Sequence, residues 1–223
     1  CHHRVGKRRC RHRRAARQNS VIWPARPPHA VAHRCADERQ TPHDKSGAPL
    51  PGRGPGSFTG LRICAGVVQG LAFAADIPAL PISSLAALAQ GVYRQTSHTH
   101  ILTVMDARMA ELYWAGFEVI DGRVVLLGEE QLTSPEQLDE SQAVLNSDRN
   151  WIGVGDGWRF SAQFPAHVAA MVKPLGHIFH VQAQDLVRLA DYDFQQGLQV
   201  PAEQALPVYL RGKSAWRKVG EQG

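Results

Sequence analysis

The longest apolar stretch of the chain runs from Phe58 to Ala75 and predicts a helix. Only Arg62 and Gln69 are clearly polar within it. Ser57 can cap its first turn, and Pro78 prevents the helix from continuing much beyond Ala75. The residues before Ser57 predict a turn-rich loop because proline and glycine disfavour an earlier helix start; they read Gly52-Arg53-Gly54-Pro55-Gly56.

The apolar residues of this predicted helix lie on two sides of it. They form one stripe of Phe58, Leu61, Ala65, Val68 and Ala72 and a second stripe of Cys64, Val67, Leu71 and Ala74. A helix that is apolar on two sides is expected to be covered on two sides. Gly66 and Gly70 are four residues apart and would let another backbone approach closely. Which stripe faces the chain's own core cannot be decided from the pattern.

After this helix, short apolar segments alternate between strand-like and helix-like periodicity. Asp121-Gly122 predicts a tight turn between two long apolar strands, and Pro135 is tolerated in the first turn of a short helix. Together the segments predict a mixed α/β protein. We expect strands at 79–83, 100–105, 111–120, 123–127 and 151–154, and helices at 84–94, from Ser134, and at 183–194.

Charge and composition divide the chain near residue 52. Residues 1–52 hold 12 Lys and Arg against 3 Asp and Glu, or +9, whereas residues 53–223 hold 13 against 17, or −4. The first segment contains one Ile, one Leu and one Trp, so it cannot bury enough surface to offset its ordering entropy. The remaining 171 residues suffice for a compact domain or two small lobes.

Residues 1–51 are therefore expected to be disordered, or translated out of frame, because the first Met is Met105 and the segment has no folding pattern. A second interpretation is an arginine-rich arm for nucleic acid. A third is a zinc site, although no C-x₂₋₄-C pair is present; its ligands would come from Cys10, His12, His29, His33 and Cys35. With Cys64 alone in the globular part and no apolar leader segment, we expect a cytoplasmic protein without a membrane span.

No motif in the globular part forms a complete catalytic constellation. The glycine-rich loop before Phe58 lacks the lysine of a P-loop. Asp106-Ala107-Arg108, at a strand end, predicts either a tuned carboxylate or a charge pair that fixes the strand junction. Gly155-Asp156-Gly157 follows a strand and predicts either a loop for nucleotide phosphates or a plain turn. No metal site is expected, because the histidines lack ligand spacing.

Several of these motifs together resemble a known family. Gly52 to Arg62 reads GRGPGSFTGLR, and the later motifs are Asp106-Ala107-Arg108-Met109, Gly155-Asp156-Gly157-Trp158 and Pro207-Val208-Tyr209-Leu210-Arg211. In order and spacing they are similar to the TsaB (YeaZ) family of the TsaD/Gcp-like superfamily. The motif residues that carry the resemblance are Gly54, Pro55, Gly56, Ser57, Thr59, Gly60, Asp106 and Arg108.

The resemblance implies an actin-like ATPase fold with two ribonuclease H-like lobes over residues 52–219, divided near residue 104. It also implies a non-catalytic scaffold subunit that pairs with the catalytic subunit TsaD and the ATPase TsaE. That complex transfers threonylcarbamoyl from threonylcarbamoyl-AMP to the adenosine adjacent to the tRNA anticodon. ATP and a metal would belong to the partner subunits, tRNA would be reached through the complex, and the chain alone would form a homodimer.

The resemblance implies that the helix from Phe58 meets the equivalent helix of TsaD. The expected interface residues are Phe58, Leu61, Arg62, Ala65, Gly66, Val68, Gln69 and Gly70. Residues 1–51 depart from the family, which opens with strands and a further interface helix, so we expect missing strands in the first lobe and poor stability. Alternative functions are a metallopeptidase-like enzyme of the same superfamily and an independent RNA-binding protein using the basic arm.

Overall fold

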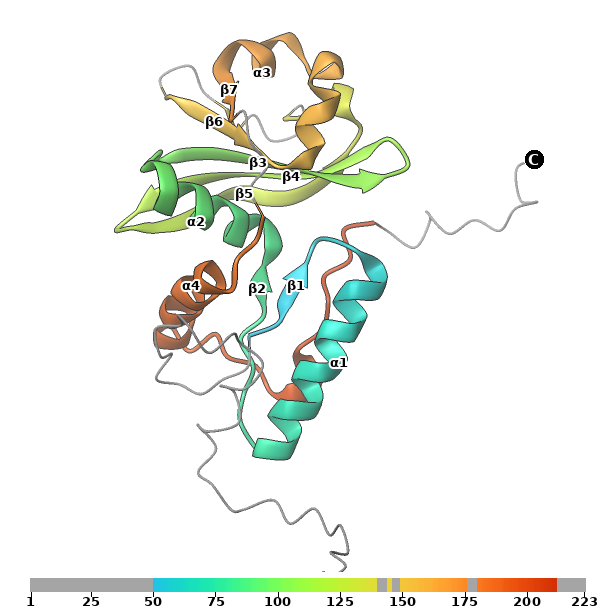
Figure 1. Ribbon diagram of the computed structural model, residues 1–223, viewed down its shortest axis with the longest axis vertical. Helices are drawn as coiled ribbons and strands as arrows, with labels where there is room; N and C mark the ends of the chain where they lie inside the picture. Colours follow the sequence, from blue (N-terminus) through green and yellow to red (C-terminus); the bar gives the residue numbers. More distant parts are fainter. Residues whose placement is uncertain (1–49, 140–143, 146–148, 176–179, 212–223) are drawn as a thin grey trace, which may run out of the picture.

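The structure is a computed structural model that describes residues 50–139, 144–145, 149–175 and 180–211 (Figure 1). Within these residues it has two sheets, one of two strands and one of five. The mixed α/β class predicted from the sequence is therefore confirmed. The interpretations of residues 1–49, including the arginine-rich arm and the zinc ligands, lie outside the described residues.

The small sheet pairs β1 (Gly52–Gly54) with β2 (Ile82–Ser83) in parallel, and α1 (Phe58–Ala75) connects the two strands. The prediction of a loop at Gly52–Gly54 was wrong, because these residues form a strand. On the other side of β1, the backbone N–H of Val208 donates to the carbonyl oxygen of Arg53 at 2.8 Å. A segment near the C-terminus thus lies beside β1.

The bounds predicted for α1 are confirmed at both ends. The Ser57 side chain accepts a hydrogen bond from the Gly60 N–H, which satisfies one of the free donors of the first turn. At the other end, Asp76 adopts the left-handed conformation with φ 53°, and its N–H contacts the carbonyls of the last turn. Asp76 therefore terminates the helix before Pro78 is reached.

The large sheet has the strand order β5-β4-β3-β6-β7. β3 (His100–Arg108), β4 (Glu111–Ile120) and β5 (Arg123–Thr133) form an antiparallel meander, while β6 (Trp151–Val154) and β7 (Val172–Pro174) extend it in parallel beyond β3. The predicted boundary near residue 104 falls inside β3. β7 was not predicted, because its three residues carry no alternation of their own.

Helices cover both faces of the large sheet. α2 (Ser84–Thr96) packs on one face, and its apolar side forms a core with β3, β4 and α4 (Ala183–Gln195). The other face is covered by the 3₁₀ helix η4 (Asp156–Gln163) and by α3 (Ala166–Met171), which close a second core around Trp114 and Trp151. Short 3₁₀ turns, η3 (Pro135–Gln137) and η5 (Ala202–Gln204), complete the described elements.

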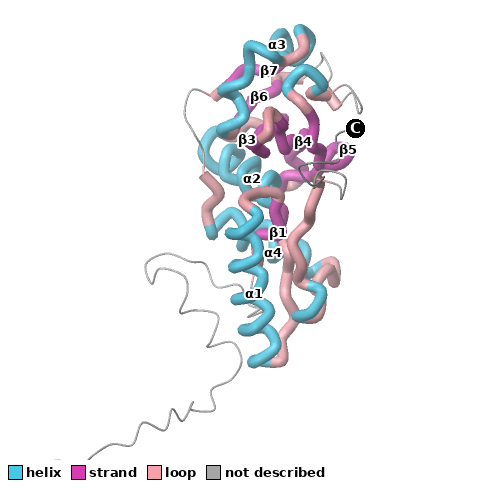
Figure 2. The backbone as a smooth tube through the Cα atoms, turned by 90° about the vertical axis from the view of Figure 1, so that its right-hand side faces the viewer, coloured by secondary structure: helices cyan, strands magenta, loops and turns pink. Residues whose placement is uncertain are grey.

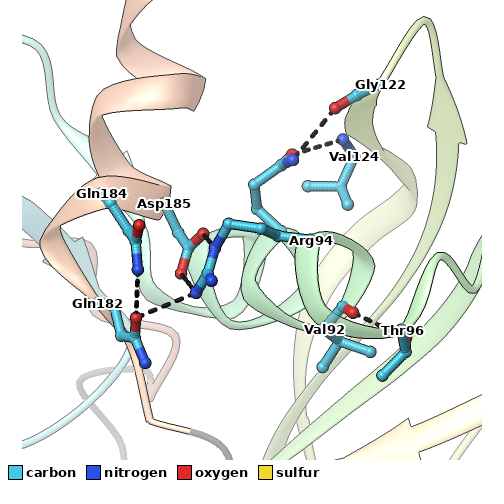
Figure 3. A network of polar contacts seen from close by, with 9 residues as sticks. Val92, Arg94, Thr96, Gly122, Val124, Gln182, Gln184 and Asp185 are labelled. Atoms are coloured by element: carbon cyan, nitrogen blue, oxygen red, sulfur yellow. Dashed lines mark hydrogen bonds and ion pairs between the residues drawn. The ribbon is translucent and has the colours of Figure 1, made fainter. Parts of the chain in front are cut away.

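Polar contacts hold α2 to its neighbours at the junction between the two sheets (Figure 3). The Arg94 guanidinium of α2 donates to both carboxylate oxygens of Asp185 in α4, at 2.8 and 3.2 Å, and to Gln182. On the same helix, the buried Gln90 side chain donates to the carbonyl of Gly122 and accepts from the N–H of Val124. These contacts fix α2 against both α4 and the β4–β5 turn.

Candidate functional site

The inward face of α1 packs against the chain itself. Ala65, Val68 and Ala72 are buried, and Val68 forms a small apolar cluster with Ala79 and Ala205. Gly54 permits this close packing, because a Cβ atom built on it would lie 2.8 Å from the Leu61 side chain. The stripe that contains Leu61, Ala65, Val68 and Ala72 is thus the one that faces the core.

The outward face of α1 is apolar and exposed. Ile63, Val67 and Phe73 are 63%, 54% and 84% exposed. Between them, Cβ atoms built on Gly66 and Gly70 would have no heavy atom within 4 Å. Figure 2 shows α1 in front of the small sheet, with no described element over it. The combination of large apolar and small residues on one open helix face is suited to packing against another helix.

The predicted interface residues are divided between these two faces. Phe58, Arg62, Gly66 and Gly70 are exposed, and Leu61 and Gln69 are half-buried. Ala65 and Val68, in contrast, are buried against the chain's own residues and are not accessible to a partner. Ile63 and Phe73 were missed because they belong to neither of the two stripes; their only signal was an apolar side chain on a helix.

The same composition makes α1 the one helix, among the described residues, that is long and apolar enough to cross a membrane. By itself this is weak support for a membrane span, because core helices have the same composition. One side of α1 packs against β1 of the small sheet and against η5. The open side has no apolar cover among the described residues.

Side chains from β3 and η4 come together where β3 and β6 of the large sheet end. The Asp156 carboxylate accepts from the Asp106 N–H at 2.9 Å, while the Asp106 carboxylate contacts the guanidinium groups of Arg159 at 2.5 Å and Arg108 at 3.3 Å. The Asp106 side chain is only 3% exposed. The structure thus brings two motifs singled out in the sequence, at 106–108 and 155–157, into one hydrogen-bonded junction.

The glycines of this junction are required by close packing. Gly155 has φ 111°, and a Cβ atom on it would lie 2.2 Å from the carbonyl oxygen of Val104 in β3. A Cβ atom on Gly157 would lie 2.7 Å from the Val104 side chain. The loop therefore lies directly on β3, and its glycines are explained by this contact. Phosphate binding by the loop stays a prediction.

Comparison with known proteins identifies the family. The family model described as TsaD, tRNA N6-adenosine threonylcarbamoyltransferase, matches residues 51–218. The tRNA threonylcarbamoyladenosine biosynthesis protein TsaB of Escherichia coli is 38% identical over 170 residues, which cover 75% of this chain and 72% of the relative. The protein of the same name from Haemophilus influenzae is 35% identical over 178 residues, covering 75% and 71%.

A solved structure agrees with these relatives. YeaZ from Pseudomonas aeruginosa is 39% identical and superposes with a TM-score of 0.66, covering 73% of this chain and 74% of that one. The chain belongs to the TsaB (YeaZ) family. Its two sheets and their connecting helices accordingly form the actin-like, ribonuclease H-like fold that the family resemblance implied.

The glycine-rich motif that precedes α1 in this TsaB-family chain has a structural role. Gly54 ends β1 with φ 96°, Ser57 caps α1, and Thr59 and Gly60 lie exposed in its first turn. The motif therefore turns the chain sharply from the small sheet into the helix. Its effect is to fix the position and start of α1.

This TsaB-family chain has a cavity of about 190 Å³ between β2, β5 and α4, and the acidic side chains of Glu130 and Asp193 are among those that line it. Arg53 binds Glu130 through two hydrogen bonds, at 2.9 and 3.1 Å, and Ser83 contacts the same carboxylate. Burial raises the pKa of Asp193, while the nearby Arg123 and Arg53 partly oppose this shift.

Among the described residues, no group of three or more His, Cys, Asp or Glu side chains could hold a metal ion.

Proposed function

We propose that this chain is a non-catalytic subunit in tRNA threonylcarbamoyladenosine biosynthesis. It binds the transferase subunit TsaD, with TsaE joining the complex, and supports transfer of threonylcarbamoyl to the adenosine adjacent to the anticodon. The names of its relatives support the pathway. The observation that carries the pairing is the open apolar face of α1, defined by Ile63, Val67 and Phe73 with Gly66 and Gly70 between them.

Covering this face would release a substantial free energy. Burial of a large apolar side chain contributes about 1.5 to 3 kcal/mol when it goes from fully exposed to fully buried. Scaled by the exposed fractions of Ile63, Val67 and Phe73, this gives about 3 to 6 kcal/mol. The glycines allow a facing helix to approach closely enough to exclude water. Because this chain matches the family model described as TsaD, we expect the transferase to present an equivalent helix.

The geometry of the β3–β6 junction supports a structural rather than a catalytic role for its carboxylate. Asp106 contacts two arginines and the backbone N–H of Arg108, and its side chain is nearly inaccessible. A general base must reach the proton that it abstracts. Under this proposal, ATP and metal belong to the partner subunits, and the chain meets tRNA in the cytoplasm through the complex.

The pairing is tested with the full chain and the TsaD protein of the same organism. Val67→Asp places a charge on the outward face of α1 and should weaken binding at least 100-fold. Ile120→Asp is the matched control, because Ile120 is 50% exposed at the C-terminal end of β4. The affinity of this variant for TsaD should stay within 2-fold of wild type. Affinity is measured by isothermal titration calorimetry.

Activity of the reconstituted complex completes the test. Adding the chain to TsaD, TsaE and threonylcarbamoyl-AMP should increase formation of the modified adenosine in tRNA, and Val67→Asp should abolish this increase. If wild-type chain does not bind TsaD, or if Val67→Asp binds normally, the proposed function is wrong. Light scattering of the chain alone shows whether the same face forms a homodimer, which Val67→Asp should then dissociate.

A further inference from the structure

The outward face of α1 is too small to form a stable complex by itself. With 18 residues, the helix is about 27 Å long, and the exposed half of a cylinder about 10 Å wide presents about 400 Å². A specific and stable interface covers about 800 Å² on each partner. A partner that binds α1 therefore needs about as much surface again from the elements beside it.

The residues from Val208 to Arg211 continue this surface away from α1. The Arg62 Nε atom donates to the Tyr209 hydroxyl at 3.2 Å, and the Tyr209 ring lies 5.7 Å from the ring of Phe58 at the start of α1. Figure 1 shows this last described segment rising beside α1 toward the end of the β3–β4 pair. Phe58 is 43% and Tyr209 is 48% exposed.

Arg211 then binds the turn between β3 and β4. Its guanidinium donates to the carbonyl oxygens of Ala107 at 3.2 Å and Arg108 at 3.4 Å, contacts the Met109 sulfur at 3.0 Å, and pairs with Glu111. One side chain thus satisfies two backbone carbonyls of the turn. The hairpin and the C-terminal segment are held as one unit.

The turn that Arg211 holds is strained and exposed. Arg108, Met109 and Ala110 have φ values of 66°, 56° and 58°, so three successive residues with side chains adopt the left-handed conformation. Such strain is found where function requires a fixed geometry. Here it projects Met109, which is 73% exposed, and the Arg108 side chain, which is 81% exposed. Methionine, arginine and aromatic residues are enriched in protein interfaces.

We propose that the hairpin tip, Arg108 and Met109, is a second docking element for the same transferase subunit that covers α1. The inference rests on the proposed function. It extends the TsaD interface from α1, beside the small sheet, to the β3–β4 turn of the large sheet. Arg211 acts as a positioning residue that holds the tip in its binding geometry. A protein is favoured over RNA because Arg108 and Arg211 each pair with a carboxylate of the chain, whereas Met109 needs an apolar groove.

The test compares the same substitution at two exposed positions of one hairpin. In the full chain, Met109→Asp should weaken binding to TsaD at least 10-fold, and Ile120→Asp should not change it beyond 2-fold. Arg211→Ala should also weaken binding and, in addition, increase amide hydrogen exchange at residues 107–110. If Arg211 only stabilised another part of the fold, Arg211→Ala would not increase hydrogen exchange selectively at this turn. Thermal melting within about 2 °C of wild type shows that Met109→Asp is folded.

Each outcome separates this inference from the proposed function. Loss of TsaD binding in both Val67→Asp and Met109→Asp supports the inference. Loss in Val67→Asp with normal binding in Met109→Asp overturns the inference and leaves the proposed function standing. Normal TsaD binding together with weaker tRNA binding by Met109→Asp, measured by fluorescence anisotropy, assigns the tip to RNA and also overturns it. Absence of any binding by the wild-type chain overturns both.

Discussion

Replacing Arg94 by methionine should destabilise the fold by about 3 to 5 kcal/mol, because it leaves the Asp185 carboxylate buried and unpaired. Asp185 has no exposed side-chain surface, and both of its oxygens accept from the Arg94 guanidinium (Figure 3). These hydrogen bonds raise the pKa of Arg94. Methionine keeps the aliphatic part of the arginine side chain, so the change removes the charge with little loss of packing.

The two partners of this pair should respond unequally. The Arg94 side chain is 28% exposed and also donates to Gln182, so in Asp185→Asn the guanidinium keeps contact with water and with a second acceptor. Loss of a charged hydrogen bond then costs about 1.5 to 3 kcal/mol. Arg94→Met should therefore be the more destabilising variant.

Urea unfolding followed by far-UV circular dichroism measures both variants. The expected loss in Arg94→Met corresponds to a melting temperature lowered by roughly 6 to 20 °C for a domain of this size. Arg188→Met, at an exposed position of α4, is the control and should change the free energy of unfolding by less than about 0.5 kcal/mol. A loss below about 1 kcal/mol in Arg94→Met, or a larger loss in Asp185→Asn, would refute the reasoning.

Three further outcomes follow from the packing and charge described above. Gly66→Ala and Gly70→Ala should each stabilise the chain by about 0.5 to 1 kcal/mol in thermal melts while weakening TsaD binding, and unchanged affinity would show that the glycines do not face the partner. Gly153→Ala should destabilise by at least about 1 to 3 kcal/mol in urea, since its Cβ would lie 1.8 Å from the Trp158 ring; wild-type stability would contradict the packing. Asp193 retains its proton in the folded state at pH values where the unfolded chain has lost it, so its contribution to stability should fall as pH rises above about 4. In urea titrations at several pH values, the stability of Asp193→Asn relative to wild type should therefore increase as the pH rises, and a constant difference would contradict the raised pKa.

The limits of α1 could be predicted because their causes are local. Ser57 and the proline before it set the start, and the apolar run ends at a residue that adopts the left-handed conformation. β1 could not be predicted from Gly52–Gly54, because the strand that pairs with it within the described part of the chain, β2, lies nearly thirty residues later. A three-residue strand with two glycines has no periodicity that distinguishes it from a turn.

The site could be located from the sequence only in part. The pattern showed that α1 has two apolar sides, but both stripes were equally apolar, so their assignment depended on contacts with residues such as Ala205. The sequence singled out this region only as a tuned carboxylate or as a charge pair that fixes a strand junction, because Arg211 reaches the hairpin tip from about a hundred residues away. Contacts at such separations leave no local signal in the sequence.

The contact between Arg62 and Tyr209 also determines when during synthesis the surface around α1 becomes complete. The two residues are 147 positions apart, so at about 5 to 20 residues per second the helix waits roughly 7 to 30 s for its neighbour to be made. Over that interval Val68 lacks its contact with Ala205, so the inward side of α1 is only partly covered. The inward side of α1 is therefore completed only when the segment around Ala205, which follows η5, has been made.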